Sequence, residues 1–167
     1  MRLRPFPPFV ALGLFLLLLA LPLACTQAPD LEIERAEVAR VVESNIGWAL
    51  TKDLDLSFST VDQTEDLFFF SPDSAGTTQG FARFVENSEW FMDDDFKAVR
   101  NELKELYIGI SPRADAAWFH CFLDDINEWQ GREASWYNVR WTGTLVKRPG
   151  GWKIVQMHFS FPVERFR

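Results

Sequence analysis

Carboxylates are the side chains of this sequence with the widest capacity for acid–base chemistry. A base that moves a proton needs apolar surroundings that tune its pKa and a hydrogen-bond donor nearby. One crowded stretch supplies five candidates for such a base: Asp53, Asp55, Asp62, Glu65 and Asp66. The same residue types cap helices and solvate turns, and we expect that structural role for most of them.

Two histidines and two tyrosines are the other groups able to transfer a proton. Tyr107 is expected to be a strand residue with its hydroxyl at the surface. His120 and His158 both fall in predicted strands; His158 shares a mostly apolar face, where a histidine is either a hydrogen-bonded core residue or part of a pocket wall. Two histidines do not specify a zinc site, and Asp93–Asp95 lacks the fuller oxygen pattern of a calcium site. We therefore expect no metal and no cofactor.

The two cysteines, Cys25 and Cys121, have different surroundings. Cys121 lies within a predicted strand and resembles a small core hydrophobe. Cys25 ends the run Leu21-Pro22-Leu23-Ala24-Cys25, which is similar to a bacterial lipobox. Two cysteines cannot build a disulfide scaffold.

The first 24 residues are typical of an export signal. Arg2 and Arg4 precede an unbroken apolar run over Phe9–Leu21, which is short for a membrane-spanning helix. We expect residues 1–24 to be a leader, Cys25 to carry a lipid, and residues 25–30 to be a tether. Plain secretion and an uncleaved anchor are the alternatives. The expected location is the bacterial cell envelope, on the periplasmic or extracellular side, with the lipid holding the protein to a membrane.

Composition limits the remaining possibilities. The chain has 167 residues, which fits one domain, and the 143 residues after the leader keep 22 of its 25 aromatic side chains. The formal net charge is −7 and the sequence pI is about 4.8. Nucleic acid is thereby excluded as a partner, because phosphate binding needs a basic face.

The hydrophobic spacing predicts helices followed by a long run of strands. Helices are expected over 32–50, 53–61 and 79–91, and strands over 67–70, 97–110, 116–124, 135–147 and 152–159. The turn Arg148-Pro149-Gly150-Gly151 joins the last two strands. This order predicts an α+β fold with helices packed on one face of a sheet.

Three runs resemble SnoaL-like domains of the superfamily that includes nuclear transport factor 2 and ketosteroid isomerase. They are Asp66–Asp73, Asp115–Phe119 and a closing hairpin that comprises Val139–Arg148 and Gly151–Ser160. The resemblance implies a cone-shaped fold over residues 31–167, with three N-terminal helices packed on a curved, mostly antiparallel sheet. It also implies an apolar cavity that opens at one end. Relatives include enzymes, binding scaffolds and oligomerisation domains, so the resemblance does not select an activity.

Candidate ligand-binding residues lie mainly on the last two long strands. Alternation predicts Tyr137, Val139, Trp141, Gly143 and Leu145 on the apolar face, and a mixed polar and aromatic opposite face that includes Arg140. Arg140 would hold an anionic ligand, an interface partner or an internal carboxylate. The residues expected to contact a ligand are Tyr137, Trp141, His158, Arg140 and Trp118.

Three functions follow from this interpretation. The first is non-catalytic binding of a small apolar or amphipathic molecule in the cone, with self-association as a homodimer through the sheet face. The second is a cofactor-independent cyclase, isomerase or dehydratase that uses carboxylate or histidine acid–base chemistry. The third is an assembly module with a vestigial cavity. A cavity with an acid or histidine and a second polar group within hydrogen-bond reach would favour the enzyme.

Overall fold

Three helices, two of them continued by a 3-10 turn, form the first half of the domain. The computed structural model describes residues 28–73 and 76–163; the predicted leader and the first half of the tether, including Cys25, lie outside them. The elements are α1 (Leu31–Gly47), η1 (Trp48–Leu50), α2 (Leu54–Thr60), α3 (Phe81–Ser88) and η3 (Glu89–Met92). Asp30 caps α1 and Asp53 caps α2, since each carboxylate accepts hydrogen bonds from backbone N–H groups of the first turn. The three predicted helices are confirmed to within a few residues.

The other layer is a curled sheet of seven strands, four of which have ten or more residues. They are β1 (Phe68–Phe70), β2 (Thr78–Gln79), β3 (Phe96–Ile110), β4 (Ala116–Trp129), β5 (Arg132–Glu133), β6 (Trp136–Arg148) and β7 (Gly151–Ser160). The order across the sheet is β2-β1-β7-β6-β4-β3, with β5 paired to β4. All pairs are antiparallel except β1 with β7. The predicted α+β class and mostly antiparallel sheet are confirmed.

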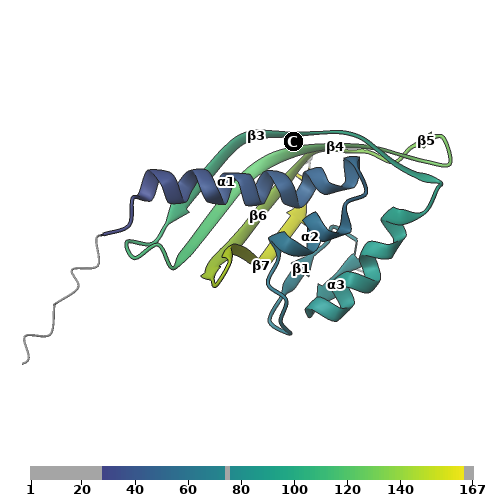
Figure 1. Ribbon diagram of the computed structural model, residues 1–167. Helices are drawn as coiled ribbons and strands as arrows, with labels where there is room; N and C mark the ends of the chain where they lie inside the picture. Colours follow the sequence, from purple (N-terminus) through teal and green to yellow (C-terminus); the bar gives the residue numbers. More distant parts are fainter. Residues whose placement is uncertain (1–27, 74–75, 164–167) are drawn as a thin grey trace, which may run out of the picture.

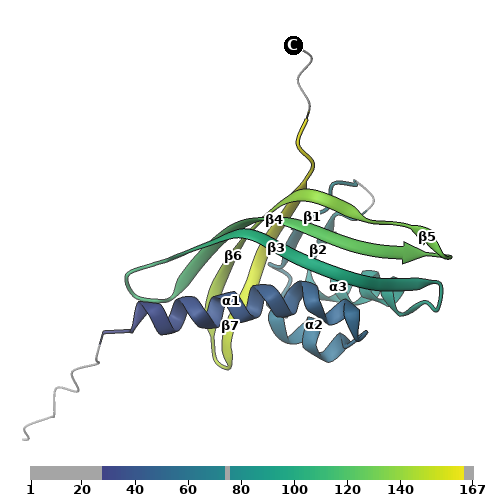
Figure 2. The same ribbon diagram turned by 90° about the horizontal axis from the view of Figure 1, so that it is seen from above.

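All three helices lie on one side of the sheet. In Figure 1, α1 runs along the strands, while α2 and α3 lie together near β1. The view from above shows β3 and β4 sweeping past the helices toward β5 (Figure 2). The core between the layers includes Val38 and Val42 of α1 against Phe119, Trp141 and Ile154 of the sheet, and each of these side chains is at most 2% exposed.

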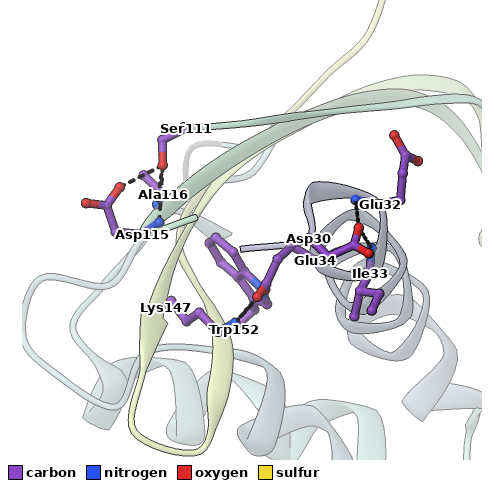
Figure 3. Close-up of polar contacts among 9 residues, drawn as sticks. All are labelled: Asp30, Glu32, Ile33, Glu34, Ser111, Asp115, Ala116, Lys147 and Trp152. Carbon is purple, nitrogen blue, oxygen red and sulfur yellow. Dashed lines mark hydrogen bonds and ion pairs between the residues drawn. The ribbon is translucent and has the colours of Figure 1, made fainter. Parts of the chain in front are cut away.

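Polar contacts fix the first turns of α1 to the β6–β7 hairpin. The Glu34 carboxylate accepts hydrogen bonds from Lys147 Nζ and from Trp152 Nε1, the latter at 2.8 Å (Figure 3). These two donors hold the pKa of Glu34 below its ordinary value. In the neighbouring β3–β4 turn, the Ser111 hydroxyl donates to Asp115 Oδ1 at 2.6 Å and accepts from two backbone N–H groups.

An ion pair between Asp62 and Arg148 links the segment that follows α2 to the same hairpin. Arg148 donates to both oxygens of Asp62, at 3.1 and 2.9 Å, and the Thr64 hydroxyl adds a third bond at 2.9 Å. Asp62 is 4% exposed, and the Arg148 guanidinium lowers the pKa of its carboxyl. The crowded carboxylates at residues 53–66 thus include a helix cap and a buried ion pair.

The pairing of the long strands is irregular at three places that matter below. Pairing of β3 with β4 shifts between Ala98 and Arg100 and again between Lys104 and Tyr107, so β3, at one end of the sheet, is twice interrupted. Pairing of β4 with β6 shifts after Leu123, and the extra residues on β6 include Asn138, whose φ is +53°. Such bulges turn side chains to the other face.

The helices of the described residues include none that is both long and apolar enough to cross a membrane.

Candidate functional site

A cavity of about 220 Å³ lies between the helices and the sheet. Its wall is mostly apolar, and eight of the eighteen described residues that line it carry aromatic rings, from both layers: Trp48, Phe69, Phe84, Trp90, Phe91, Phe96, Trp136 and Phe159. Six polar side chains also line it: Asn45, Thr78, Asn87, Ser88, Asp125 and Asn127. The volume is that of about seven molecules of liquid water. It therefore suits a molecule of about one ring with a short substituent.

Ring-to-ring packing holds the aromatic wall in place before any ligand enters. Trp48 meets Phe91 edge to face at 5.3 Å, and Phe91 meets Phe96 in the same manner at 5.0 Å. Trp90 stacks on Trp129 with a centroid distance of 4.8 Å. Such pairs add to the stability gained from burial. Trp90 is 48% exposed, which places part of this wall at the molecular surface.

Two of the polar residues that line the cavity, Asp125 and Asn127, point to the same side of β4. Asn127 Nδ2 donates to Asp125 Oδ2 at 2.8 Å. Burial raises the pKa of the Asp125 carboxyl, and the hydrogen bond from Asn127 opposes this shift without cancelling it. Among the described residues, no charged side chain contributes to the shift. The half-buried carboxyl therefore has no counter-ion within this part of the chain.

The backbone of Asn127 is held by hydrogen bonds, but the oxygen of its side-chain amide has no hydrogen-bond donor among the described residues. Its N–H donates to Ser135 Oγ at 3.1 Å, and its carbonyl accepts from the Ala134 N–H at 2.9 Å. The side chain is nearly buried, at 7% exposure for the residue. Its Oδ1 accepts no hydrogen bond from the described residues. A buried acceptor without a donor is rare in folded proteins and marks a place where a ligand or water is needed.

The five residues predicted to contact a ligand lie elsewhere. Trp141 is fully buried and stacks on Phe159, one layer behind the cavity wall. Arg140 and His158 are exposed, and Trp118 is 48% exposed. Tyr137 is 55% exposed and donates its hydroxyl hydrogen to Glu133. None of the five is among the residues that line the cavity.

Two face assignments need correction. Tyr137 was expected on the apolar face with Val139, but the bulge at Asn138 turns it outward and brings Trp136 into the cavity instead. His158 was expected on a mostly apolar face with Ile154. Pairing of β7 with β6 shifts between these two residues, so Ile154 is buried while His158 is exposed.

The other candidates for chemistry also lie outside the cavity. Tyr107 is 53% exposed and stacks on the exposed His120 at 5.0 Å. Cys121 is a free, buried thiol whose pKa burial raises to about 12. Across the described residues, no group of three or more His, Cys, Asp or Glu side chains is arranged to hold a metal ion.

Sequence reasoning missed Asp125 and Asn127. The predicted strand ended at residue 124, which left both residues in a loop. In the structure β4 continues to Trp129. The signal that was available is the alternation of Leu123, Asp125 and Asn127, which places all three on the inner face once the strand is extended.

Comparison with known proteins gives one consistent result. The family model of the SnoaL-like domain matches residues 38–164. A proposed dehydratase of the NTF2-like family from Streptomyces avermitilis has a TM-score of 0.66 at 13% identity, with 81% of this chain and 100% of that chain covered. An NTF2-like superfamily protein from Salmonella enterica also has a TM-score of 0.66, at 18% identity and 81% and 95% coverage.

A third similar structure has a different role. The association domain of CaMKII from C. elegans has a TM-score of 0.58 at 16% identity, with 78% of this chain and 97% of that chain covered. No curated protein matches the chain.

Proposed function

Because the chain belongs to the SnoaL-like domain family and has an NTF2-like fold, we propose that it binds a small, largely apolar molecule in the cavity between its helices and its sheet. The observation that carries this proposal is an aromatic wall around one carboxyl–amide pair, Asp125 and Asn127. Sites for small molecules are mostly apolar, with a few placed polar groups that set the orientation of the ligand.

The size of the cavity sets the size of the ligand. A volume of about 220 Å³ is below the roughly 300–1,000 Å³ of sites for drug-sized molecules. Binding is driven by the apolar surface that a single ring or short chain removes from water, at about 25 cal/mol per Å². Affinity for such a ligand is expected to be in the micromolar range or weaker, since few atoms take part.

A cavity-filling variant tests the proposal. Ala49 lines the cavity, so Ala49→Trp places an indole in the ligand's space. Ala36→Trp is the matched control, because Ala36 lies on the exposed side of α1. Ligand-detected NMR with toluene and p-cresol is expected to show binding to the wild type and to Ala36→Trp, and none to Ala49→Trp. Equal binding to both variants would place the ligand elsewhere and reject the proposal.

A second function is favoured by one specific observation, the raised pKa of Asp125 beside a hydrogen-bonding partner. Such a carboxyl is suited to moving a proton, as a cofactor-independent isomerase, cyclase or dehydratase requires. His120 and His158 lie outside the cavity, so Asp125 is the acid–base group of this alternative. In D2O it would exchange the hydrogens next to the carbonyl of a bound ketone such as acetophenone. Exchange no faster than with Asp125→Asn protein excludes this function.

Export and lipid attachment remain part of the proposal. Their support is the basic start, the apolar run Phe9–Leu21 and the lipobox-like run that ends at Cys25. The protein would then work in the bacterial cell envelope, on the periplasmic or extracellular side. Cys25→Ser is expected to release the mature protein from membranes or to leave the precursor uncut. A membrane-bound chain with residues 1–24 still attached would instead favour an anchor.

Self-association through the outer face of the sheet is the proposed assembly. That face carries half-exposed rings, including Phe70, Tyr107 and Trp118. Phe70, His158, Thr142, His120 and Tyr107 form one row across the neighbouring strands. Light scattering at high micromolar concentration is expected to report a dimer, and Trp118→Glu a monomer. A wild-type monomer under these conditions would reject this assembly.

A further inference from the structure

The charges and unsatisfied acceptors of the cavity narrow the class of ligand beyond size and apolarity. We infer that the ligand is a small protonated primary amine, whose ammonium group binds between Asp125 and Asn127 while its ring or chain contacts the aromatic wall. This inference rests on the proposed binding function and adds the charge of the ligand to it.

The first argument is the charge of the wall. Asp125 is the sole ionisable side chain among the described residues that line the cavity, and no Lys, Arg or His lines it. Elsewhere among the described residues the carboxyl has no charged partner, since burial and the Asn127 amide are the two causes of its shifted pKa. Asp125 is half-buried, and a carboxylate that is partly removed from water without a counter-ion is unfavourable. A cationic ligand supplies that counter-ion, whereas an anionic ligand adds a second negative charge.

The second argument is that two acceptor oxygens of the cavity receive no hydrogen bond from the described residues. Asn127 uses its Nδ2 on Asp125 and leaves its buried Oδ1 without a donor. Asp125 Oδ1 also receives no hydrogen bond from the described residues. An ammonium group carries three donors and no acceptor, so one such group has enough donors for both oxygens. A ketone or ether, which offers acceptors alone, supplies a donor to neither.

The third argument is the chemistry of the remaining wall. Three indole rings, Trp48, Trp90 and Trp136, line the same cavity as the carboxyl. Indole faces attract cations, and the attraction increases where water is excluded. The two parts of an arylalkyl ammonium ion thus both find complementary surroundings, its charge at Asp125 and its ring among aromatic side chains.

Three probes of nearly equal shape and different charge test the inference. Phenethylamine is a cation at pH 7, 2-phenylethanol is neutral and phenylacetate is an anion. Their dissociation constants are measured by ligand-detected NMR and calorimetry on the full mature chain. The amine is expected to bind at least about tenfold more tightly than the alcohol, and phenylacetate is expected not to bind.

Two substitutions of Asp by Asn test whether the Asp125 carboxylate causes the preference for the amine. Asp125→Asn is expected to remove the preference for the amine and to change the affinity for the alcohol by less than about threefold. Asp124→Asn is the matched control, because the neighbouring Asp124 points to the opposite face, where its Oδ1 accepts from Lys104 Nζ at 2.8 Å and from the Asn138 N–H at 2.7 Å. The amide oxygen can still accept both bonds, so Asp124→Asn is expected to keep the bulge at Asn138 and the preference for the amine.

The outcomes distinguish a failure of this inference from a failure of the proposed binding function. If the alcohol binds as tightly as the amine, or if phenylacetate binds best, the inference is wrong and the proposed binding function stands. If Asp124→Asn loses the preference as well, Asp125 is not its source and the inference is also wrong. If no probe binds, both the inference and the proposed function are rejected.

Discussion

Gly143 lies at the centre of the sheet, and replacing it by alanine tests the packing beneath the cavity. An added Cβ would lie 2.5 Å from Cε1 of Phe119 and 2.8 Å from the backbone oxygen of Gln156. Carbon atoms in contact are about 3.5–4.0 Å apart, so the Phe119 ring would have to withdraw by about 1 Å. It has no room to do so, because it is 2% exposed and packs edge-on against Trp141 at 4.9 Å.

The expected loss follows from these contacts. Overpacking a core costs about 1–3 kcal/mol, and the reduced freedom of the unfolded chain offsets about 0.4–1 kcal/mol of it. Gly143→Ala is therefore expected to lower the free energy of unfolding by about 1–2 kcal/mol and the Tm by about 3–8 °C. Urea denaturation followed by tryptophan fluorescence, together with a thermal scan, measures both.

Gly109→Ala is the matched control for this experiment. Its added Cβ would lie even closer to a ring, 2.2 Å from Cε2 of Trp118. That indole is 48% exposed and can rotate into water, so Gly109→Ala is expected to be less destabilising than Gly143→Ala. The reasoning would be refuted if Gly143→Ala unfolded at the wild-type urea midpoint. It would also be refuted if Gly109→Ala lost more free energy of unfolding than Gly143→Ala.

Three further predictions concern titratable groups. Asp62→Ala removes three hydrogen bonds to a buried carboxylate and is expected to lower the free energy of unfolding at pH 7 by about 1–2 kcal/mol. Because the pKa of Asp62 is lowered in the fold, this difference is present above about pH 4 and narrows in more acidic urea titrations; a pH-independent difference would contradict it. Asp125→Asn is expected to stabilise the protein at pH 7 by about 0.5–2 kcal/mol. The folded pKa of Asp125 is raised, so the penalty from its ionisation exists above that pKa and vanishes below about pH 4; equal stability of variant and wild type at pH 7 would count against it. Burial raises the thiol pKa of Cys121 to about 12, so maleimide labelling at pH 8, located by mass spectrometry, is expected at Cys121 only after unfolding; rapid labelling of the native protein would contradict the burial.

The elements of the fold were predictable because their signals are local. The apolar spacing of α1 and the caps Asp30 and Asp53 lie within the segments that they define. The parallel pairing of β1 with β7 is different, since it joins Phe69 to Met157 across most of the domain. No local pattern encodes such a contact, and the two-residue strands β2 and β5 are too short to show a period.

The candidate site was harder to predict because a long-range contact decides which side chains face inward. The Asp124 carboxylate accepts a hydrogen bond at 2.7 Å from the N–H of Asn138, fourteen residues later. Asn138 has a positive φ there, and the bulge exchanges the faces of Tyr137 and Trp136. Period-two alternation has no means of anticipating this change, so it assigned the wrong aromatic residue to the cavity.

The interruptions of β3 have a consequence for how copies of this chain can meet at high concentration. An outermost strand that is long and regular offers its unpaired backbone groups to any other strand, which leads to aggregation. β3 is long, but two irregularities break its hydrogen-bonding row, and charged side chains such as Arg100, Glu102 and Lys104 follow one another along it. Growth by adding strands in a continuous ribbon is thereby discouraged at this end. The proposed dimer uses side chains on the outer face of the sheet instead, and such a contact would end at two subunits.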